Sequence, residues 1–221
     1  MLQTTAQVPF SAKFSPPPKK PSTIEREYLR SPEVKAMIRA AKKVGRHGIR
    51  DGGIILLMFR HGLRTAELVA LKWTQIDLAG GYIEVHRVKH GHDSIHPLRS
   101  PELRALRQIQ RDYADTSYVF VSERKAPLST RSIRHIIARA GKLAGIPFQV
   151  HPHQRSRVRG RSSCFATTGN ALRYAHACGY YLAAQGHDTR AIQDYLGHKN
   201  IHHTVRYTQM SPQRFENFWM D

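Results

Sequence analysis

The stretch Leu196-Gly-His-Lys-Asn-Ile-His-His-Thr-Val-Arg-Tyr-Thr208 decides how the rest of the chain is interpreted. Gly197 ends one helical pattern, and Tyr207 follows His198 by nine residues within a short amphipathic segment, 204–210. A phenol has a pKa of about 10, so at neutral pH it is a weak nucleophile. It attacks phosphorus usefully only where cations stabilise the developing charge and a neighbouring group accepts its proton. A lone tyrosine is more often a core aromatic, so the nucleophile interpretation depends on its neighbours.

The charge of the chain points to a polyanionic partner. Its 221 residues carry 35 Lys and Arg against 16 Asp and Glu, a formal charge of +19. No acidic residue lies between Glu123 and Asp188, whereas eleven Lys or Arg do. An excess of this size is typical of nucleic-acid binding, although a merely soluble cationic protein is the alternative. No run approaches the roughly 20 apolar residues of a membrane-spanning helix, so no membrane partner is expected.

The cysteines and histidines indicate neither a disulfide framework nor a metal site. Cys164 and Cys178 are the two cysteines, too few for a disulfide scaffold and too far apart for a Cys-x-x-Cys site. Among the fourteen histidines, candidate ligand sets such as His151, His153 and His176 with Cys164 fit no standard zinc spacing. No signal peptide is visible. The expectation is a cytoplasmic, nucleoid-associated protein with reduced thiols and no metal.

Periodicity predicts a mainly α-helical fold with one small antiparallel β-sheet. Residues 1–22 hold five of the twelve prolines and no acid, and they are expected to form a disordered basic tail. Alternating residues predict strands over 82–86 and 94–98, joined by a hairpin tip at 89–92, and residues 118–121 form a short strand or extended piece. Residues 50–53, Arg-Asp-Gly-Gly, are expected to break the helical pattern, and 154–169 to form an exposed basic loop. The period predicts helices from Ser31, over 54–59, from Leu63, and over 100–113, 129–143, 171–184, 188–195 and 212–219. Ser31, Ser100 and Ser129 are the expected N-caps of three of these helices, and Asp188 or Thr189 that of a fourth.

Three basic positions precede the tyrosine. Arg64 lies at a predicted helix start beside strongly apolar sequence, where a guanidinium is held rigidly and can offer its fork to two phosphate oxygens. Lys89, at the hairpin tip, has a stem long enough to reach a leaving oxygen. Arg173 and then His198 follow. Taken singly, each is more typical of a solvated surface charge.

Together, these positions resemble the tyrosine recombinases, the phage-integrase type of site-specific recombinase. The similarity to the fimbrial phase-variation recombinases is greatest over residues 186–204, and the resemblance as a whole covers roughly 23–208. It implies that residues 23–221 form a tyrosine recombinase catalytic domain. The matching motifs are His61-Gly-Leu-Arg64-Thr-Ala-Glu67-Leu, Arg87-Val-Lys89, Leu172-Arg173, Leu196-Gly-His198 and Tyr207.

The resemblance implies a covalent mechanism on double-stranded DNA. Tyr207 attacks a phosphodiester and gives a 3′-phosphotyrosine with a free 5′-hydroxyl, and a partner strand's hydroxyl reverses the step. Arg64 and Arg173 clamp the non-bridging oxygens as charge builds. Lys89 acts as general acid toward the leaving 5′-oxygen.

The remaining implied roles are supporting ones. His198 hydrogen-bonds the phosphate, and Glu67 supports the site from behind. No cofactor is needed, because the phosphotyrosyl bond retains the energy of the cut strand. The family assembles four protomers on two DNA sites, and accessory DNA-bending proteins are further expected partners. Expected DNA contacts are Lys13, Lys19, Lys20, Arg131, Arg134, Arg155, Arg157, Arg159 and Arg161.

The chain also departs from the family pattern of His-x-x-Arg. Asn170 takes the place of the histidine that assists the tyrosine proton, and the 25 positions from Arg173 to His198 exceed the usual spacing by about half a turn. The basic stretch 154–169 looks inserted between His153 and the arginine motif. Two explanations stay open. Either a loop was added and the site was rebuilt, in which case His153 could fold back and replace the missing histidine, or this copy has lost part of its activity.

Three functions stay open on the sequence. The first is a site-specific DNA recombinase or integrase, with inversion, integration and excision undecided. The second is a type IB topoisomerase, which shares the chemistry, although the fimbrial-like segment argues against it. The third is a catalytically impaired DNA-binding relative of a recombinase, which Asn170 and the insertion favour.

Overall fold

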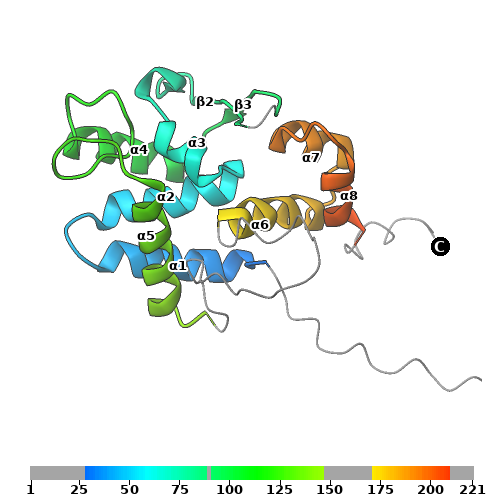
Figure 1. Ribbon diagram of the computed structural model, residues 1–221, viewed down its shortest axis with the longest axis horizontal. Coiled ribbons are helices and arrows are strands. Elements are labelled where there is room, and N and C mark those ends of the chain that lie inside the picture. The colour runs from blue at the N-terminus through cyan, green and yellow to red at the C-terminus, as the bar shows by residue number, and fades with distance from the viewer. Residues whose placement is uncertain (1–27, 89–90, 147–170, 210–221) are drawn as a thin grey trace, which may run out of the picture.

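The computed structural model describes residues 28–88, 91–146 and 171–209, and from 171 to 175 it describes the backbone alone. Helices dominate, and one small sheet lies at the edge of the molecule (Figure 1). The mainly α prediction with a small antiparallel sheet is therefore confirmed. The elements in chain order are α1 (Ser31–Lys43), α2 (Gly48–His61), α3 (Thr65–Ala70), the 3₁₀ turn η1 (Trp73–Gln75), β1 (Ile76–Asp77), β2 (Tyr82–Val85), β3 (Ser94–Pro97), α4 (Ser100–Asp112), α5 (Thr130–Leu143), α6 (Ala171–Ala184), α7 (Thr189–Leu196) and α8 (His202–Thr208).

Helix α2 runs through the centre of the larger hydrophobic core. The predicted break at residues 50–53 is wrong, because the helix continues from Gly48 to His61 without interruption. The reason is packing: a Cβ at Gly53 would lie 2.9 Å from the Ile109 side chain, and one at Gly52 would lie 2.8 Å from that of Lys42. Both glycines let neighbouring helices approach closely, which offsets their poor helix propensity.

Carboxylates and small polar residues define where several helices begin. Ser129 caps α5, as predicted, and of the two predicted candidates for α7, Asp188 and Thr189, it is Asp188 that caps the helix. At α1 and α4 the predicted caps Ser31 and Ser100 are instead the first helical residues. The glutamate two residues into α4, Glu102, accepts from the Arg99 backbone N–H, which is half of a capping box.

The sheet has three antiparallel strands in the order β1-β2-β3. Strand β1, which the sequence pattern did not predict, pairs Ile76 with Ile83, while β2 pairs Glu84 with Ile95 of β3. Residues 118–121 make only isolated bridges, at Tyr118 and Val121, so this segment is an extended piece without a strand of its own. The inward residues of β2 join the core beneath the sheet.

Helices α6, α7 and α8 form a smaller unit beside α2, at the opposite end from the α1–α2 turn (Figure 1). Gly197 ends α7 in the left-handed conformation at φ 65°, which residues with a Cβ rarely adopt, as the Gly-His motif predicts. In the described part of the chain no helix is long and apolar enough to cross a membrane. The predicted tail 1–22, the loop 154–169 and the helix 212–219 lie outside the described residues.

Candidate active site

Tyr207 lies in α8 with its side chain turned into the small unit. It is 2% exposed, and its hydroxyl lies 2.7 Å from Nδ1 of His176 in α6. The ring packs edge-on against Tyr180, with the ring centroids 5.0 Å apart. It also lies directly over Gly179, where a Cβ would be 2.6 Å from the tyrosine ring. The hydroxyl thus lies between α6 and α8 beside the imidazole of His176, and the ring packs on α6 at Gly179, which has no side chain.

The acidity of this hydroxyl is set by burial and by two nearby arginines. Burial raises the pKa of Tyr207 above its ordinary value, and the positive charges of Arg206 and Arg64 oppose that rise. Burial, helped by the same two arginines, lowers the pKa of His176 to about 4. At neutral pH the pair therefore consists of a protonated phenol and a neutral imidazole.

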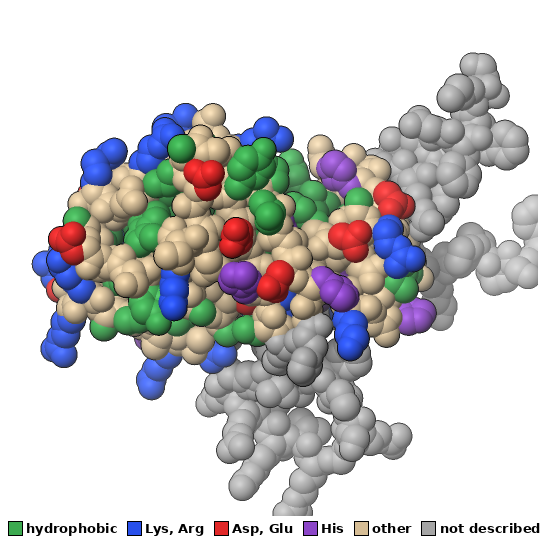
Figure 2. Space-filling view, turned by 90° about the horizontal axis from the view of Figure 1, so that it is seen from above, with side chains coloured by type: hydrophobic (Ala, Val, Ile, Leu, Met, Phe, Trp, Pro, Cys, Tyr) green, Lys and Arg blue, Asp and Glu red, His purple; other side chains and the backbone are tan. Residues whose placement is uncertain are grey.

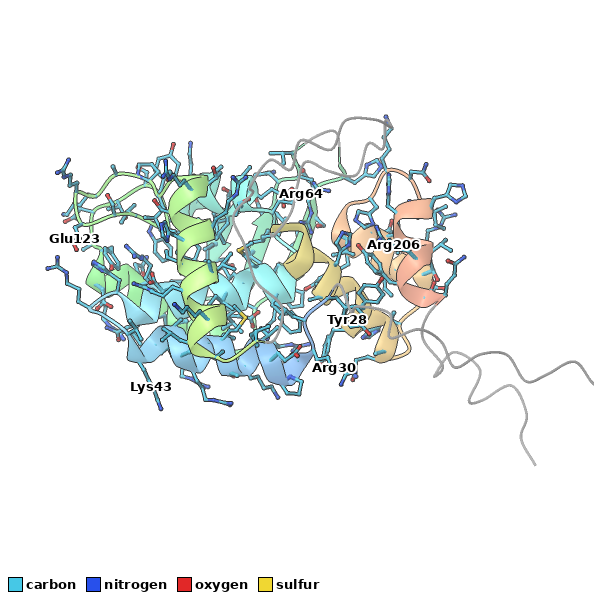
Figure 3. The ribbon with its side chains drawn as sticks, turned by 60° about the horizontal axis from the view of Figure 1, so that its bottom comes forward. Tyr28, Arg30, Lys43, Arg64, Glu123 and Arg206 are labelled. Atoms are coloured by element: carbon cyan, nitrogen blue, oxygen red, sulfur yellow. The ribbon has the colours of Figure 1, made fainter. Side chains whose placement is uncertain are left out.

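Arg64 is held at the start of α3. Its Nη1 donates to Glu67 Oε1 at 3.0 Å and to the Val88 carbonyl at 3.2 Å. Glu67 also accepts from the Arg64 backbone N–H at 2.8 Å, so the carboxylate fixes both ends of this arginine. The Arg64 side chain remains 32% exposed, whereas that of Glu67 is 1% exposed. Figure 3 shows Arg64 on the side of the molecule that faces the α6–α8 unit.

Arg87, which the sequence analysis quoted only within a motif, is buried behind Arg64 and contacts Glu67. Its buried guanidinium donates to Glu67 Oε2 at 3.1 Å and to the carbonyls of His61, Gly62 and Tyr195. Burial lowers the pKa of Arg87, and Glu67 opposes that shift. The Arg87 side chain therefore connects the end of α2, the Glu67 carboxylate that holds Arg64, and the end of α7. The alternating pattern of β2 could have indicated that Arg87 is buried, because it continues past the end of the strand: Ile83, Val85 and Arg87 are all buried.

His198 follows the end of α7 and lies close to the tyrosine. The two ring centroids are 6.1 Å apart, and His198 Nδ1 lies 2.8 Å from the Thr204 hydroxyl. Burial lowers the pKa of His198 to about 4, with Arg64 as the next cause. The positive charge of Arg64 thus acts on Tyr207, His176 and His198 together, which locates one site at the junction of α3, α6 and α8.

The other predicted site residues are placed only in part. Arg173 lies in α6, three residues before His176, and its side chain is among those not described. Arg131 and Arg134 are exposed near the start of α5, away from Tyr207.

Figure 2 shows Lys and Arg spread over the visible surface, whereas histidines gather in the half that carries α7 and α8. The described residues contain no group of three or more His, Cys, Asp or Glu that could hold a metal ion. Outside the described residues lie Lys13, Lys19, Lys20, Lys89, His153, Arg155, Arg157, Arg159, Arg161 and Asn170.

His176 is the residue that the sequence analysis missed as a partner of the tyrosine. It was considered only among metal ligands, since 31 residues separate it from Tyr207. No local spacing predicts a contact between residues that meet only when α6 packs on α8. The structure thus brings a buried tyrosine, a neutral histidine and an arginine at a helix start together beside a small sheet, as expected for the tyrosine recombinase catalytic domain that the sequence resembles.

Comparison with known proteins gives the same class. The sequence profile of the Phage integrase family matches residues 27–214. The chain is 41% identical over 201 residues to the type 1 fimbriae regulatory protein FimE of Escherichia coli K12, covering 88% of this chain and 91% of FimE. It is 38% identical to FimB of the same strain, covering 88% and 90%. The crystal structure of XerA recombinase superposes with a TM-score of 0.67 at 30% identity, over 89% of this chain and 63% of XerA. The chain belongs to the phage integrase family and is a site-specific tyrosine recombinase.

Proposed function

We propose that Tyr207 cuts one strand of double-stranded DNA by attacking a phosphodiester. Its oxygen bonds to phosphorus, the bond to the 5′-oxygen breaks, and a 3′-phosphotyrosine remains on the protein. The observation that carries the proposal is the placement of the Tyr207 hydroxyl, buried beside a neutral imidazole and within the fields of Arg64 and Arg206. Charge that develops on a phosphate here meets fixed cations, which is the largest usual source of stabilisation for such a step.

Arg64 is the best-supported phosphate ligand. Both hydrogen bonds that its side chain makes to described residues come from Nη1, which leaves Nη2 for a phosphate oxygen. Glu67 Oε1 accepts from Nη1 and holds the guanidinium in place, so little reorganisation is needed when DNA binds. Arg173, from α6, serves as the second clamp on the non-bridging oxygens, and Lys89 protonates the leaving 5′-oxygen.

His198 acts as a further phosphate ligand. Its Nδ1 is engaged by Thr204, which leaves Nε2 as the nitrogen that can donate to a phosphate oxygen. A neutral imidazole suits this role, because it can donate one hydrogen bond without the cost of a buried charge.

The partners follow from the charge and from the family. The net charge of +19 supports binding to double-stranded DNA, with exposed Arg131 and Arg134 among the contacts and with basic residues outside the described ranges. We infer a homotetramer on two DNA sites at the nucleoid in the cytoplasm, with accessory DNA-bending proteins. The similarity to the fimbrial regulators favours inversion of a DNA segment over integration or excision.

A nicked suicide substrate tests the nucleophile directly. The protein should form a covalent adduct that denaturing electrophoresis resolves, and Tyr207→Phe should abolish it without weakening DNA affinity. Tyr82→Phe, at an exposed tyrosine on the sheet, is the matched control and should retain the adduct. An adduct that persists in Tyr207→Phe would exclude Tyr207 as the nucleophile.

A further inference from the structure

The cleavage reaction proposed above needs an acceptor for the phenolic proton. Family resemblance assigns that task to a position that Asn170 occupies in this chain, three residues before Arg173. An amide cannot accept a proton at ordinary pH, whereas a neutral imidazole can. His176 lies three residues after Arg173 in α6, on the opposite side of the arginine along the chain.

The geometry at His176 is that of a general base. The 2.7 Å between Nδ1 and the Tyr207 hydroxyl is a short hydrogen bond, within the range expected between a catalytic base and the proton that it removes. With Nδ1 as acceptor, the imidazole carries its proton on Nε2. The two rings are tilted by 55°, and Gly179 and Tyr180 hold the tyrosine ring from below.

We propose that Nδ1 of His176 accepts the Tyr207 proton as the tyrosine oxygen bonds to phosphorus. The inference rests on Tyr207 being the nucleophile. The O–H bond of Tyr207 breaks, the proton passes to His176, and the oxygen forms the phosphotyrosyl bond while the 5′-oxygen leaves with a proton from Lys89. In the reverse step the imidazolium returns its proton to the departing tyrosine.

The same cations act in opposite directions on the two partners. In the free protein, burial and the charges of Arg206 and Arg64 lower the pKa of His176, whereas burial raises the pKa of Tyr207 and the two arginines oppose that rise. A phosphodiester bound at Arg64 brings a negative charge that counters these cations, so the imidazolium that forms on proton transfer is easier to form than in the free protein.

The test compares His176→Ala with His176→Asn on the nicked suicide substrate. Loss of a general base is expected to slow adduct formation about 10²–10⁴-fold in both variants. Asn places an oxygen near the position of Nδ1, so it can accept the hydrogen bond but not the proton. A rate for His176→Asn close to that of the unaltered protein would show that His176 only positions Tyr207, and would overturn the proposal.

Chemical rescue supplies a readout that a structural role does not move. Imidazole added to His176→Ala should restore the rate at least about tenfold, in proportion to its neutral fraction, because the added base occupies the vacated space. Imidazole should not accelerate His176→Asn or the control His187→Ala, at an exposed histidine between α6 and α7. Absence of rescue in a folded His176→Ala would count against the proposal.

Two further outcomes separate this inference from the proposed function. If the unaltered protein forms the adduct and His176→Ala forms it equally fast, the base is elsewhere and Tyr207 still stands. A simultaneous gain of rate in Asn170→His would assign the base to position 170. If neither the unaltered protein nor any variant forms an adduct while DNA binding is intact, the nucleophile proposal fails, and the role of His176 fails with it.

Discussion

The cores of the two parts of the molecule are built from different side chains. The larger one, spread over α1–α5 and the sheet, is aliphatic and aromatic, with residues such as Ile54, Leu57 and Phe120 completely buried. The smaller one, among α6–α8, contains only Cys178, Ala183, Ile192, Leu196 and Tyr207 as buried hydrophobic residues in the described part of the chain. Around them lie the buried polar residues Thr204, Thr208 and Gln193.

The larger part therefore provides most of the stability of the fold, whereas the small unit carries the buried polar groups next to Tyr207. The larger core is stabilised by apolar burial, which is roughly proportional to the area removed from water and insensitive to direction. In the small unit, much of the buried space is given to polar groups that need particular partners. Its position against the larger core depends on directional bonds: Arg87 to the Tyr195 carbonyl, the Tyr195 hydroxyl to the Arg60 carbonyl at 3.0 Å, and the Cys178 thiol to the same carbonyl.

The largest expected effect is from Arg87→Met, which removes the link between the two parts. It leaves Glu67 buried with one guanidinium fewer and three carbonyls without this donor, a loss expected to cost about 3–5 kcal/mol of unfolding free energy. Adduct formation per folded molecule should also fall, because α7 and Arg64 lose their common anchor. Urea denaturation and the suicide-substrate assay measure the two quantities.

Arg50→Met is the matched control within the larger part. Arg50 is also buried and bonded to a carboxylate, Asp51, and to the Val121 carbonyl. This variant should lose stability while the rate per folded molecule stays unchanged. Equal rates in Arg87→Met and Arg50→Met would show that Arg87 does not position the site. Arg87→Lys, which keeps charge without the fork, covers the case in which Arg87→Met does not fold.

Gly179→Ala should show a smaller effect on stability and a clear one on rate. The new Cβ would lie 2.6 Å from the Tyr207 ring, so the tyrosine must shift. A misplacement of this order costs up to about 10²-fold in rate, and the overpacking costs about 1–3 kcal/mol. Gly53→Ala, whose Cβ would meet the Ile109 side chain at 2.9 Å in the larger core, should affect stability alone. A full rate in Gly179→Ala would contradict the close packing of ring on helix.

Acid should destabilise the small unit through His176 and His198, and the larger part through His96. Burial lowers the pKa values of His176 and His198 to about 4 and that of His96 to about 3 in the folded state, from an ordinary value of about 6.5. Between these values the unfolded chain binds more protons than the folded one, so stability falls as the pH drops from about 6.5 toward 4. Hydrogen exchange should show loss of protection in α6–α8 over this range, with a change on the order of 1 kcal/mol or more per histidine. His176→Asn should reduce this dependence in α6–α8, and an unchanged dependence would contradict the prediction.

The smallest effect is expected from Arg131→Gln combined with Arg134→Gln on α5. Both arginines are exposed on the larger part and away from Tyr207, so their loss should leave adduct formation at saturating DNA unchanged. DNA affinity should weaken, and the slope of log affinity against log salt should fall by about 0.9 for each phosphate that the variant no longer neutralises. Fluorescence anisotropy with labelled duplex at several salt concentrations measures this slope. An unchanged slope would remove these two residues from the DNA interface.

Most helices, the hairpin strands and the order of the site residues along the chain could be predicted from the sequence, because each depends on a local period, cap or motif. Ser129 caps α5, Gly197 ends α7, and Arg64 stands at the start of α3, as predicted, and Asp188 is the cap of α7 among the two predicted candidates. The error at residues 50–53 arose because a glycine pair, taken locally, predicts a break. Only the close approach of Ile109 and Lys42 from elsewhere in the chain shows why the helix continues.

The sequence by itself determined the family, the polyanionic partner class and the identity of Tyr207, Arg64 and His198 as candidates, since charge and ordered motifs lie along the chain. The tertiary structure alone decided which groups meet. It brought His176 to the tyrosine across 31 residues and placed Arg87 between Glu67 and α7, whose Tyr195 carbonyl lies 108 residues further along the chain. Such contacts depend on how helices pack, and packing is fixed by the fit of whole surfaces, which no single stretch of sequence contains.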